Sequence, residues 1–156
     1  MKPTRRLDTW TRLCLVIALT LMTSLVPKLA AAGEPLMHVY KSPYCGCCAA
    51  WVDHMKANGF RVEVTDLQDI SRAKTLYGID EDLQSCHKAV VDGYLIEGHV
   101  PAADVKRLLT ERPKAAGLSV PGMPIGSPGM EMDNRTEPYD VVLYDREGGR
   151  TVFSRY

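Results

Sequence analysis

A cluster of three cysteines at the junction between a strand and a helix most constrains this chain. The segment reads Lys41-Ser42-Pro43-Tyr44-Cys45-Gly46-Cys47-Cys48 and follows a short run that predicts a strand. A helical pattern begins within the cluster, and Gly59 ends it. A helix N-terminus presents free N–H groups and a partial positive charge, and both favour an ionised sulfur. The cluster is therefore typical of a site for thiolate chemistry or for a soft metal ion.

The first 32 residues have the pattern of a secretory signal peptide. Basic residues precede an apolar run over residues 13–26 that is too short to span a membrane, and Ala30-Ala31-Ala32 offers a small-residue cleavage site. An uncleaved membrane anchor is the alternative, which the short run disfavours. We therefore expect an exported protein with one domain over residues 33–156 and no stable membrane insertion after the signal is cleaved.

The predicted mature domain is mildly acidic. It carries 14 lysines and arginines against 18 aspartates and glutamates, a net charge of about −4. This balance disfavours nucleic acid or an anionic membrane surface as a partner. A domain of this length can form a hydrophobic core without disulfides, so its four cysteines indicate another role.

The remaining pattern predicts the element order of a thioredoxin or glutaredoxin core. Helices are expected over residues 45–58, 69–77 and 101–111, and strands over residues 37–41, 61–66 (with one buried face), 88–91, 94–96, 139–144 and 150–153. Asp92-Gly93 predicts a hairpin with a type I′ turn. We therefore expect an α/β fold with a thioredoxin-like core, in which helices flank a mixed sheet. A loop over residues 114–138, rich in methionine, proline and glycine, and a closing hairpin follow this core.

A fourth cysteine is expected to lie opposite the cluster. Cys86 belongs to Ser85-Cys86-His87, at the turn where thioredoxin-like proteins carry a proline that packs against their Cys-x-x-Cys motif. Cys45, Cys47, Cys48 and Cys86 would then form a compact four-sulfur site. Soft thiolates select Cu(I), zinc or an iron–sulfur cluster. Adjacent cysteines suit the bridging of several ions better than a structural zinc ion, so a small multinuclear Cu(I)–thiolate cluster is predicted.

Methionines and histidines extend the predicted site. Met123, Met130 and Met132 lie in the loop 114–138, where their soft thioethers are expected to contact copper and the loop to close over it; gap-filling is the alternative. His87 directly follows Cys86 and is the best nitrogen ligand, with an exposed turn residue as the alternative. His99 either caps the helix that follows it or serves as a ligand.

Three other chemistries stay open at this stage. The cysteines could pair as two ordinary disulfides, although a Cys47–Cys86 bridge would strain the turn that a Cys45–Cys48 bridge closes. The Cys-x-x-Cys motif is also that of an exported thiol–disulfide oxidoreductase, although a third cysteine would interfere with a two-cysteine cycle. A zinc or iron–sulfur carrier is the remaining alternative.

The combined motifs resemble a known family. They are Tyr44-Cys45-Gly46-Cys47-Cys48, Ser85-Cys86-His87, Glu97-Gly98-His99-Val100-Pro101 and Pro121-Gly122-Met123-Pro124 with Ser127-Pro128-Gly129-Met130-Glu131. From about Met37 to Phe153 the chain is similar to CopG, the small exported metal-binding proteins of bacterial copper-resistance clusters. The resemblance implies a periplasmic, thioredoxin-like protein with the four cysteines as copper ligands, and other periplasmic copper-handling proteins as partners. It leaves open whether the protein is an enzyme that changes the oxidation state of copper, and it favours a binding role.

Overall fold

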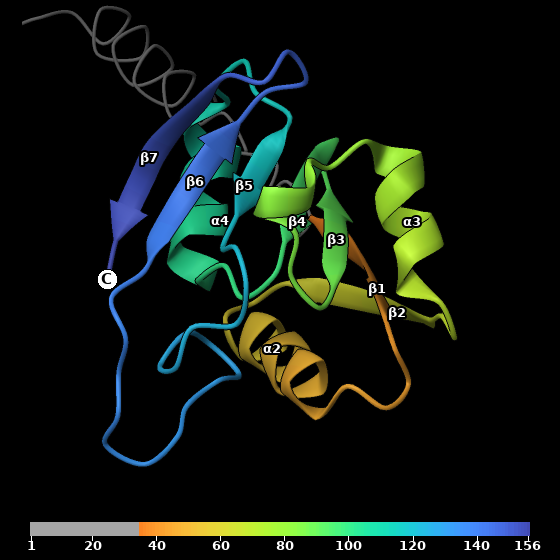
Figure 1. The fold of residues 1–156 in the computed structure, drawn as a ribbon, viewed down its shortest axis with the longest axis vertical. Helices are drawn as coiled ribbons and strands as arrows, with labels where there is room; N and C mark the ends of the chain where they lie inside the picture. The colour runs from red at the N-terminus through yellow and green to blue at the C-terminus, as the bar shows by residue number, and fades with distance from the viewer. Residues whose placement is uncertain (1–34) are drawn as a thin grey trace, which may run out of the picture. The chain divides into compact units, whose positions relative to one another are not determined.

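A seven-stranded mixed sheet forms the centre of the computed structural model, which describes residues 35–156 apart from the side chains of residues 72, 73 and 75 (Figure 1). The strands are β1 (Leu36–Lys41), β2 (Arg61–Asp66), β3 (Lys88–Val91), β4 (Tyr94–Glu97), β5 (Gly117–Ser119), β6 (Asp140–Tyr144) and β7 (Arg150–Arg155), in the order β2-β1-β3-β4-β5-β6-β7. The helices are α2 (Gly46–Ala57), α3 (Ile70–Tyr77) and α4 (Ala102–Glu111), with a 3-10 turn at Glu81–Leu83. Within this range no helix has the length and apolar character needed to cross a membrane. The predicted signal peptide lies outside the described residues.

The first four strands form the predicted thioredoxin-like core. β1 pairs in parallel with β2, which a helical crossover makes possible, and antiparallel with β3. β3 and β4 form a hairpin whose turn residues, Asp92 and Gly93, have φ angles of 49° and 86°. These positive angles are the ones a type I′ turn requires, so the hairpin prediction is confirmed.

The last three strands extend the sheet beyond β4. β5 pairs in parallel with β4 and antiparallel with β6, and β6 and β7 form the predicted closing hairpin. β5 lies within the stretch 114–138 that was expected to be a loop, so this prediction was wrong for residues 117–119. Three residues are too few to show a period of two, and β5 is defined by its neighbours in the sheet instead.

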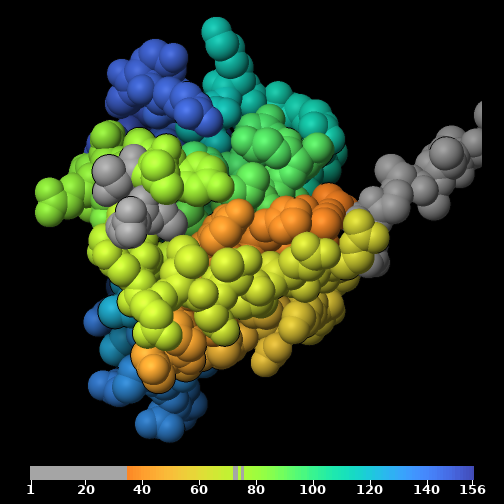
Figure 2. Space-filling model, turned by 90° about the vertical axis from the view of Figure 1, so that its right-hand side faces the viewer, coloured from red at the N-terminus to blue at the C-terminus, as the bar shows by residue number. Residues whose placement is uncertain are grey.

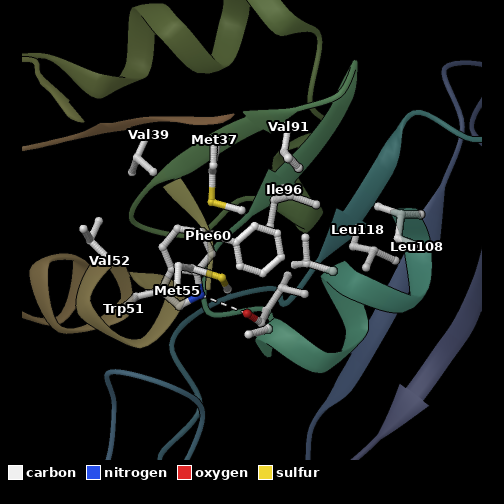
Figure 3. Close-up of a cluster of buried hydrophobic side chains, with 14 of the residues drawn as sticks. Met37, Val39, Trp51, Val52, Met55, Phe60, Val91, Ile96, Leu108 and Leu118 are labelled. Atoms are coloured by element: carbon white, nitrogen blue, oxygen red, sulfur yellow. Dashed lines mark hydrogen bonds between the residues drawn. The ribbon is translucent and has the colours of Figure 1, made fainter. Parts of the chain in front are cut away.

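The two faces of the sheet carry separate hydrophobic clusters. The larger cluster lies under α2 and α4 and includes Met37, Trp51 and Leu108 (Figure 3). Within it, the indole Nε1 of Trp51 donates a hydrogen bond of 2.9 Å to the carbonyl of Val100, which follows β4. The smaller cluster lies on the opposite face and includes Leu83, Leu95 and Tyr144. Because side chains alternate along a strand, neighbouring residues of β4 contribute to the two different clusters.

β2 forms one edge of the sheet and is mostly exposed (Figure 2). Val62 is half-buried against the larger cluster, whereas Val64 is 40% exposed. The sequence predicted one buried face for this strand, and that prediction was wrong for Val64. An edge strand has a neighbouring strand on one side only, and β2 therefore remains open to solvent over most of its length.

Replacing Gly117 tests the packing of β4 against β5. A Cβ atom at residue 117 would lie 1.7 Å from the backbone oxygen of Leu95, so the two strands would have to separate. We expect Gly117→Ala to lower the free energy of unfolding by at least about 3 kcal/mol, measured by urea denaturation. At Gly46 nothing lies within 4 Å of the added Cβ, so Gly46→Ala should change stability by less than about 0.5 kcal/mol. Similar values for the two variants would contradict the close contact.

Candidate metal centre

The cysteine cluster lies where β1 leads into α2. A turn over residues 42–45 ends β1, and the N–H of Cys45 donates to the carbonyl of Ser42 at 3.2 Å. Cys45 is the N-cap residue of α2, and its sulfur accepts the N–H of Cys48 at 3.3 Å. The cysteine therefore takes the place of the oxygen-bearing side chain that usually caps a helix. The predicted position of the cluster at a helix N-terminus is confirmed.

All four cysteine sulfurs converge. Cys86 lies on the turn before β3, and its sulfur is 3.4 Å from that of Cys48 and 3.9 Å from that of Cys47. The sulfurs of Cys45 and Cys47 are 3.5 Å apart, and all four ligand atoms lie within 4.8 Å of one another. A tetrahedral ion with metal–sulfur distances of about 2.3 Å needs sulfurs about 3.8 Å apart, and these three sulfur–sulfur distances of 3.4, 3.5 and 3.9 Å are close to that value.

A disulfide joins two of the four cysteines in this structure. Cys45 and Cys48 are bonded, whereas Cys47 and Cys86 are free thiols. The alternative of two ordinary disulfides is therefore wrong for this state, because only the Cys-x-x-Cys pair is closed. A metal ion that used all four sulfurs would require this bond to be reduced first.

Two buried histidines also approach the sulfur of Cys86. His99 Nε2 lies 3.1 Å and His87 Nδ1 lies 3.4 Å from the sulfur of Cys86, and these three atoms also lie within 4.8 Å of one another. His99 Nδ1 is 2.8 Å from the carbonyl of Pro128. A carbonyl can only accept, so Nδ1 carries the proton and Nε2 directs its lone pair toward Cys86. Trp51 packs against the His87 ring, with ring centroids 4.4 Å apart.

Burial sets the protonation of these groups. It lowers the pKa of His99 and lowers that of His87 well below its ordinary value, so both rings are neutral at pH 7 and can act as ligands. Burial, together with neighbouring Cys47, raises the pKa of Cys86 to about 12. Cys86 is therefore a thiol in the metal-free protein, and metal binding at its sulfur releases a proton.

The loop that carries the methionines packs on the start of α2. A Cβ atom at Gly129 would lie 2.6 Å from the carbonyl oxygen of Cys47, which shows how closely the two backbones approach. Met130 follows directly and is half-buried. Met123 is 51% exposed and follows Gly122, whose N–H donates to the carbonyl of Gln84. Met132 is 43% exposed, and its sulfur lies 4.0 Å from the guanidinium of Arg135. The structure therefore brings the chain around Met123 and Met130 to the site, and pairs Met132 with Arg135.

The histidines show what the sequence pattern missed. His99 was weighed as either a helix cap or a ligand and was left out of the predicted ligand set, yet its ring contacts Cys86. The helix-capping contact comes instead from His54, whose Nε2 accepts the N–H of Ala102 at 3.2 Å. The packing of α2 against the start of α4 brings His54 to this position, which no local sequence pattern indicates. His38 lies outside the site and approaches Glu63 at 3.4 Å.

Two solved structures resemble this fold closely, and both are of copper resistance protein CopG. Form 2 is 43% identical in sequence with a TM-score of 0.75, and form 1 is 45% identical with a TM-score of 0.74. Each comparison covers 79% of this chain and 98% of the solved chain. This chain belongs to the CopG family.

Two other comparisons complete this assignment. The family described as "Protein of unknown function, DUF411" matches residues 83–130, the segment from the turn before Cys86 to the methionine loop. No curated protein sequence matches the chain. Membership of the CopG family confirms the resemblance and the α/β fold predicted from the sequence.

Replacing Gly129 tests the contact between the methionine loop and α2. Gly129 and Gly122 both have positive φ angles, of 85° and 70°, but nothing lies within 4 Å of a Cβ added at Gly122. Both alanine variants introduce backbone strain, and only Gly129→Ala also introduces a clash. We expect Gly129→Ala to cost about 1–3 kcal/mol more than Gly122→Ala in urea unfolding, and to speed the alkylation of Cys47 in the reduced protein. Equal costs and equal alkylation rates would contradict the contact.

The buried histidines predict acid sensitivity of the metal-free protein. In the unfolded chain their pKa is near 6.5, whereas in the folded chain it is lower, so below pH 6.5 the unfolded state binds more protons. The free energy of unfolding should therefore be highest above pH 6.5 and fall as the pH decreases toward 5. Urea denaturation across this range should show a weaker pH dependence in His99→Gln. His38, whose side chain is 48% exposed, provides the control His38→Gln, which should keep the wild-type dependence.

Proposed function

We propose that this chain is an exported, periplasmic copper-binding protein that captures Cu(I) and serves copper resistance. The convergence of four cysteine sulfurs within 4.8 Å is the observation that carries this proposal. Relatives named copper resistance protein support copper as the metal, and thiolates prefer it in its reduced state. The proposed ligands are Cys45, Cys47, Cys48 and Cys86, with His87 as a nitrogen ligand.

Capture begins with reduction of the Cys45–Cys48 disulfide. A dithiol reductant supplies two electrons by exchange and itself becomes a disulfide, which leaves Cys45 and Cys48 as two thiolates at the N-terminus of α2, where the partial positive charge of the helix favours them. Cu(I) then displaces the proton of Cys86, whose pKa is raised to about 12. The neutral rings of His87 and His99 need no deprotonation. Copper affinity should therefore increase with pH, mainly through the cysteines.

Cys86 suits a bridging role in a multinuclear cluster. Its sulfur lies within 3.9 Å of two cysteine sulfurs and within 3.4 Å of two histidine nitrogens, so one thiolate faces two sets of donors. Cu(I) accepts low coordination numbers, and thiolates bridge it readily. Met123, Met130 and Met132 would add thioether contacts as their loop closes over the cluster. Other periplasmic copper-handling proteins are the partners expected to deliver or receive the ion.

A second candidate function is that of an exported thiol–disulfide oxidoreductase. The closed Cys45–Cys48 disulfide at the start of α2 favours it, because this is the arrangement that dithiol chemistry uses. The free thiol of Cys47 is 3.5 Å from the sulfur of Cys45 and would compete in any exchange reaction. The oxidoreductase alternative therefore gives a function to Cys45 and Cys48, but it does not explain why the sulfurs of Cys47 and Cys86 lie beside them.

Metal loading distinguishes the two functions. The exported protein is reduced, loaded with excess Cu(I) under nitrogen, desalted against a competing chelator and subjected to elemental analysis. We expect more than one copper per chain, with most of it lost in Cys86→Ser and none lost in the surface control His38→Gln. Retention of no copper would overturn the proposal. Reduction of a disulfide-containing peptide at wild-type rates by Cys47→Ser and Cys86→Ser would then establish the oxidoreductase.

A further inference from the structure

The turn that carries Cys86 is held in place by side chains. Residues 83–87 contain no proline, although this is the position where a proline was expected in a thioredoxin-like core. Ser119 Oγ donates to the carbonyl of Leu83 at 2.6 Å, and the N–H of Gly122 donates to the carbonyl of Gln84 at 3.2 Å. Ser85 Oγ donates to the carbonyl of Gly122. The backbone before Cys86 is therefore anchored to the end of the sheet and to the methionine loop.

A buried ion pair holds both backbone groups of Ser85. Oε1 of Glu97 accepts the N–H of Ser85 at 2.7 Å, and the ammonium of Lys74 donates to the Ser85 carbonyl. The two charged side chains approach each other at 3.5 Å, with Glu97 fully buried and Lys74 11% exposed. They come from different elements, since Lys74 lies on α3 and Glu97 ends β4. The residue next to Cys86 is thus fixed between two secondary-structure elements by one ion pair.

Further buried polar groups surround this carboxylate. Lys88 lies opposite Glu97 in the β3–β4 pairing, and its ammonium sits over the ring of Tyr77 at 3.8 Å from the centroid. Within residues 35–156, Lys88 Nζ, Glu97 Oε2 and Tyr144 OH are buried without a hydrogen-bond partner. Burying charged groups is costly, so a structure that needed only packing here would place apolar side chains at these positions. This carboxylate contacts the metal centre through the backbone N–H of Ser85.

We infer that Glu97 and Lys74 are positioning residues that set where the sulfur of Cys86 stands relative to the other three sulfurs and the two histidines. The ion pair fixes the peptide groups on either side of the Ser85 Cα, and so fixes the backbone from which the Cys86 side chain projects. Sulfurs 3.4 and 3.9 Å apart leave little room for error, because metal–sulfur distances vary by only a few tenths of an ångström. The expected effect of these residues on copper affinity rests on the proposed function. Their expected effect on the position and accessibility of Cys86 does not.

The first test measures Cys86 without any metal. In a background with Cys45, Cys47 and Cys48 replaced by serine, the rate of alkylation of Cys86 should rise several-fold in Glu97→Ala and in Lys74→Met. Lys74→Met is included because Glu97→Ala leaves two lysines without a counter-charge and threatens folding. Glu97→Gln keeps an oxygen that can accept the Ser85 N–H and should restore a rate near that of the parent.

A matched control separates positioning from loss of stability. Asp104 is a second buried carboxylate, on α4, and it accepts hydrogen bonds from Ser154 and from Tyr156 at 2.8 Å. Asp104→Asn should destabilise the fold but leave the alkylation rate of Cys86 unchanged. The rates are compared between variants with similar free energies of unfolding. The inference is overturned if Asp104→Asn speeds the alkylation of Cys86 as much as Lys74→Met and Glu97→Ala do. It is also overturned if neither Lys74→Met nor Glu97→Ala changes the alkylation rate.

The second test is a double-mutant cycle on copper affinity. With all four cysteines present, Lys74→Met and Glu97→Ala should weaken Cu(I) binding by about 10- to 100-fold, the usual effect of removing a group that supports a ligand. In the Cys86→Ser background the same substitutions should have no further effect, because they act through Cys86. Equal losses in both backgrounds would overturn the inference. Absence of copper from every protein, with the alkylation result intact, would overturn the proposed function and leave the positioning role standing.

Discussion

The antiparallel pairing of β1 with β3 is the constraint on which the site depends. Because the strands run in opposite directions, the end of β1 lies beside the start of β3, with Tyr40 opposite Lys88. The segment that follows β1 carries three cysteines, and the segment that precedes β3 carries the fourth. A parallel arrangement would have put these segments at opposite ends of the sheet. The convergence of four sulfurs is thus a consequence of strand direction before any side chain is considered.

The same pairing places polar side chains at the start of β3 in the buried interior, where the loss of water destabilises them. His87 projects into the larger cluster beside Trp51, whereas Lys88 projects to the other face. Burial lowers the pKa of Lys88 to about 8 and raises that of Glu97, so both groups sit in surroundings that oppose their charge. Such groups destabilise a fold unless they are paired or serve another purpose. These buried charged groups lie close to Ser85 and Cys86. In our proposal, they lower the stability of the fold but hold the Cys86 thiol in place.

Sequence patterns predicted most helices, strands and turns, but they predicted few of the contacts between residues that are far apart in the sequence. The long periodic segments, the Asp92-Gly93 turn and the position of Cys86 were recoverable, because each depends on local spacing or on chain order. β5 was missed because its three residues are defined by their neighbours in the sheet. The contact of His54 with Ala102 and that of His99 with Cys86 were not predicted, since helix packing decides which ring reaches which partner. Lys74 and Glu97 carry no local signal, because most charged residues are solvated.

The disulfide and the proposed metal ion use the same sulfurs, so the proposal links the redox state of the protein to its affinity for the metal. Closing the Cys45–Cys48 bond removes two of the four thiolates and leaves Cys47 and Cys86 as the free thiols of the cluster. A metal that binds the open state alone stabilises that state in proportion to its concentration and affinity. Under the proposed function, copper protects the cysteines from oxidation, and oxidation releases copper. Cys86 lies outside the disulfide and contacts both histidines, so one thiol and two ring nitrogens lie together while the disulfide is closed. Under the proposed function, these three groups offer a metal ion a binding position even when the cysteine pair at the N-terminus of α2 is oxidised.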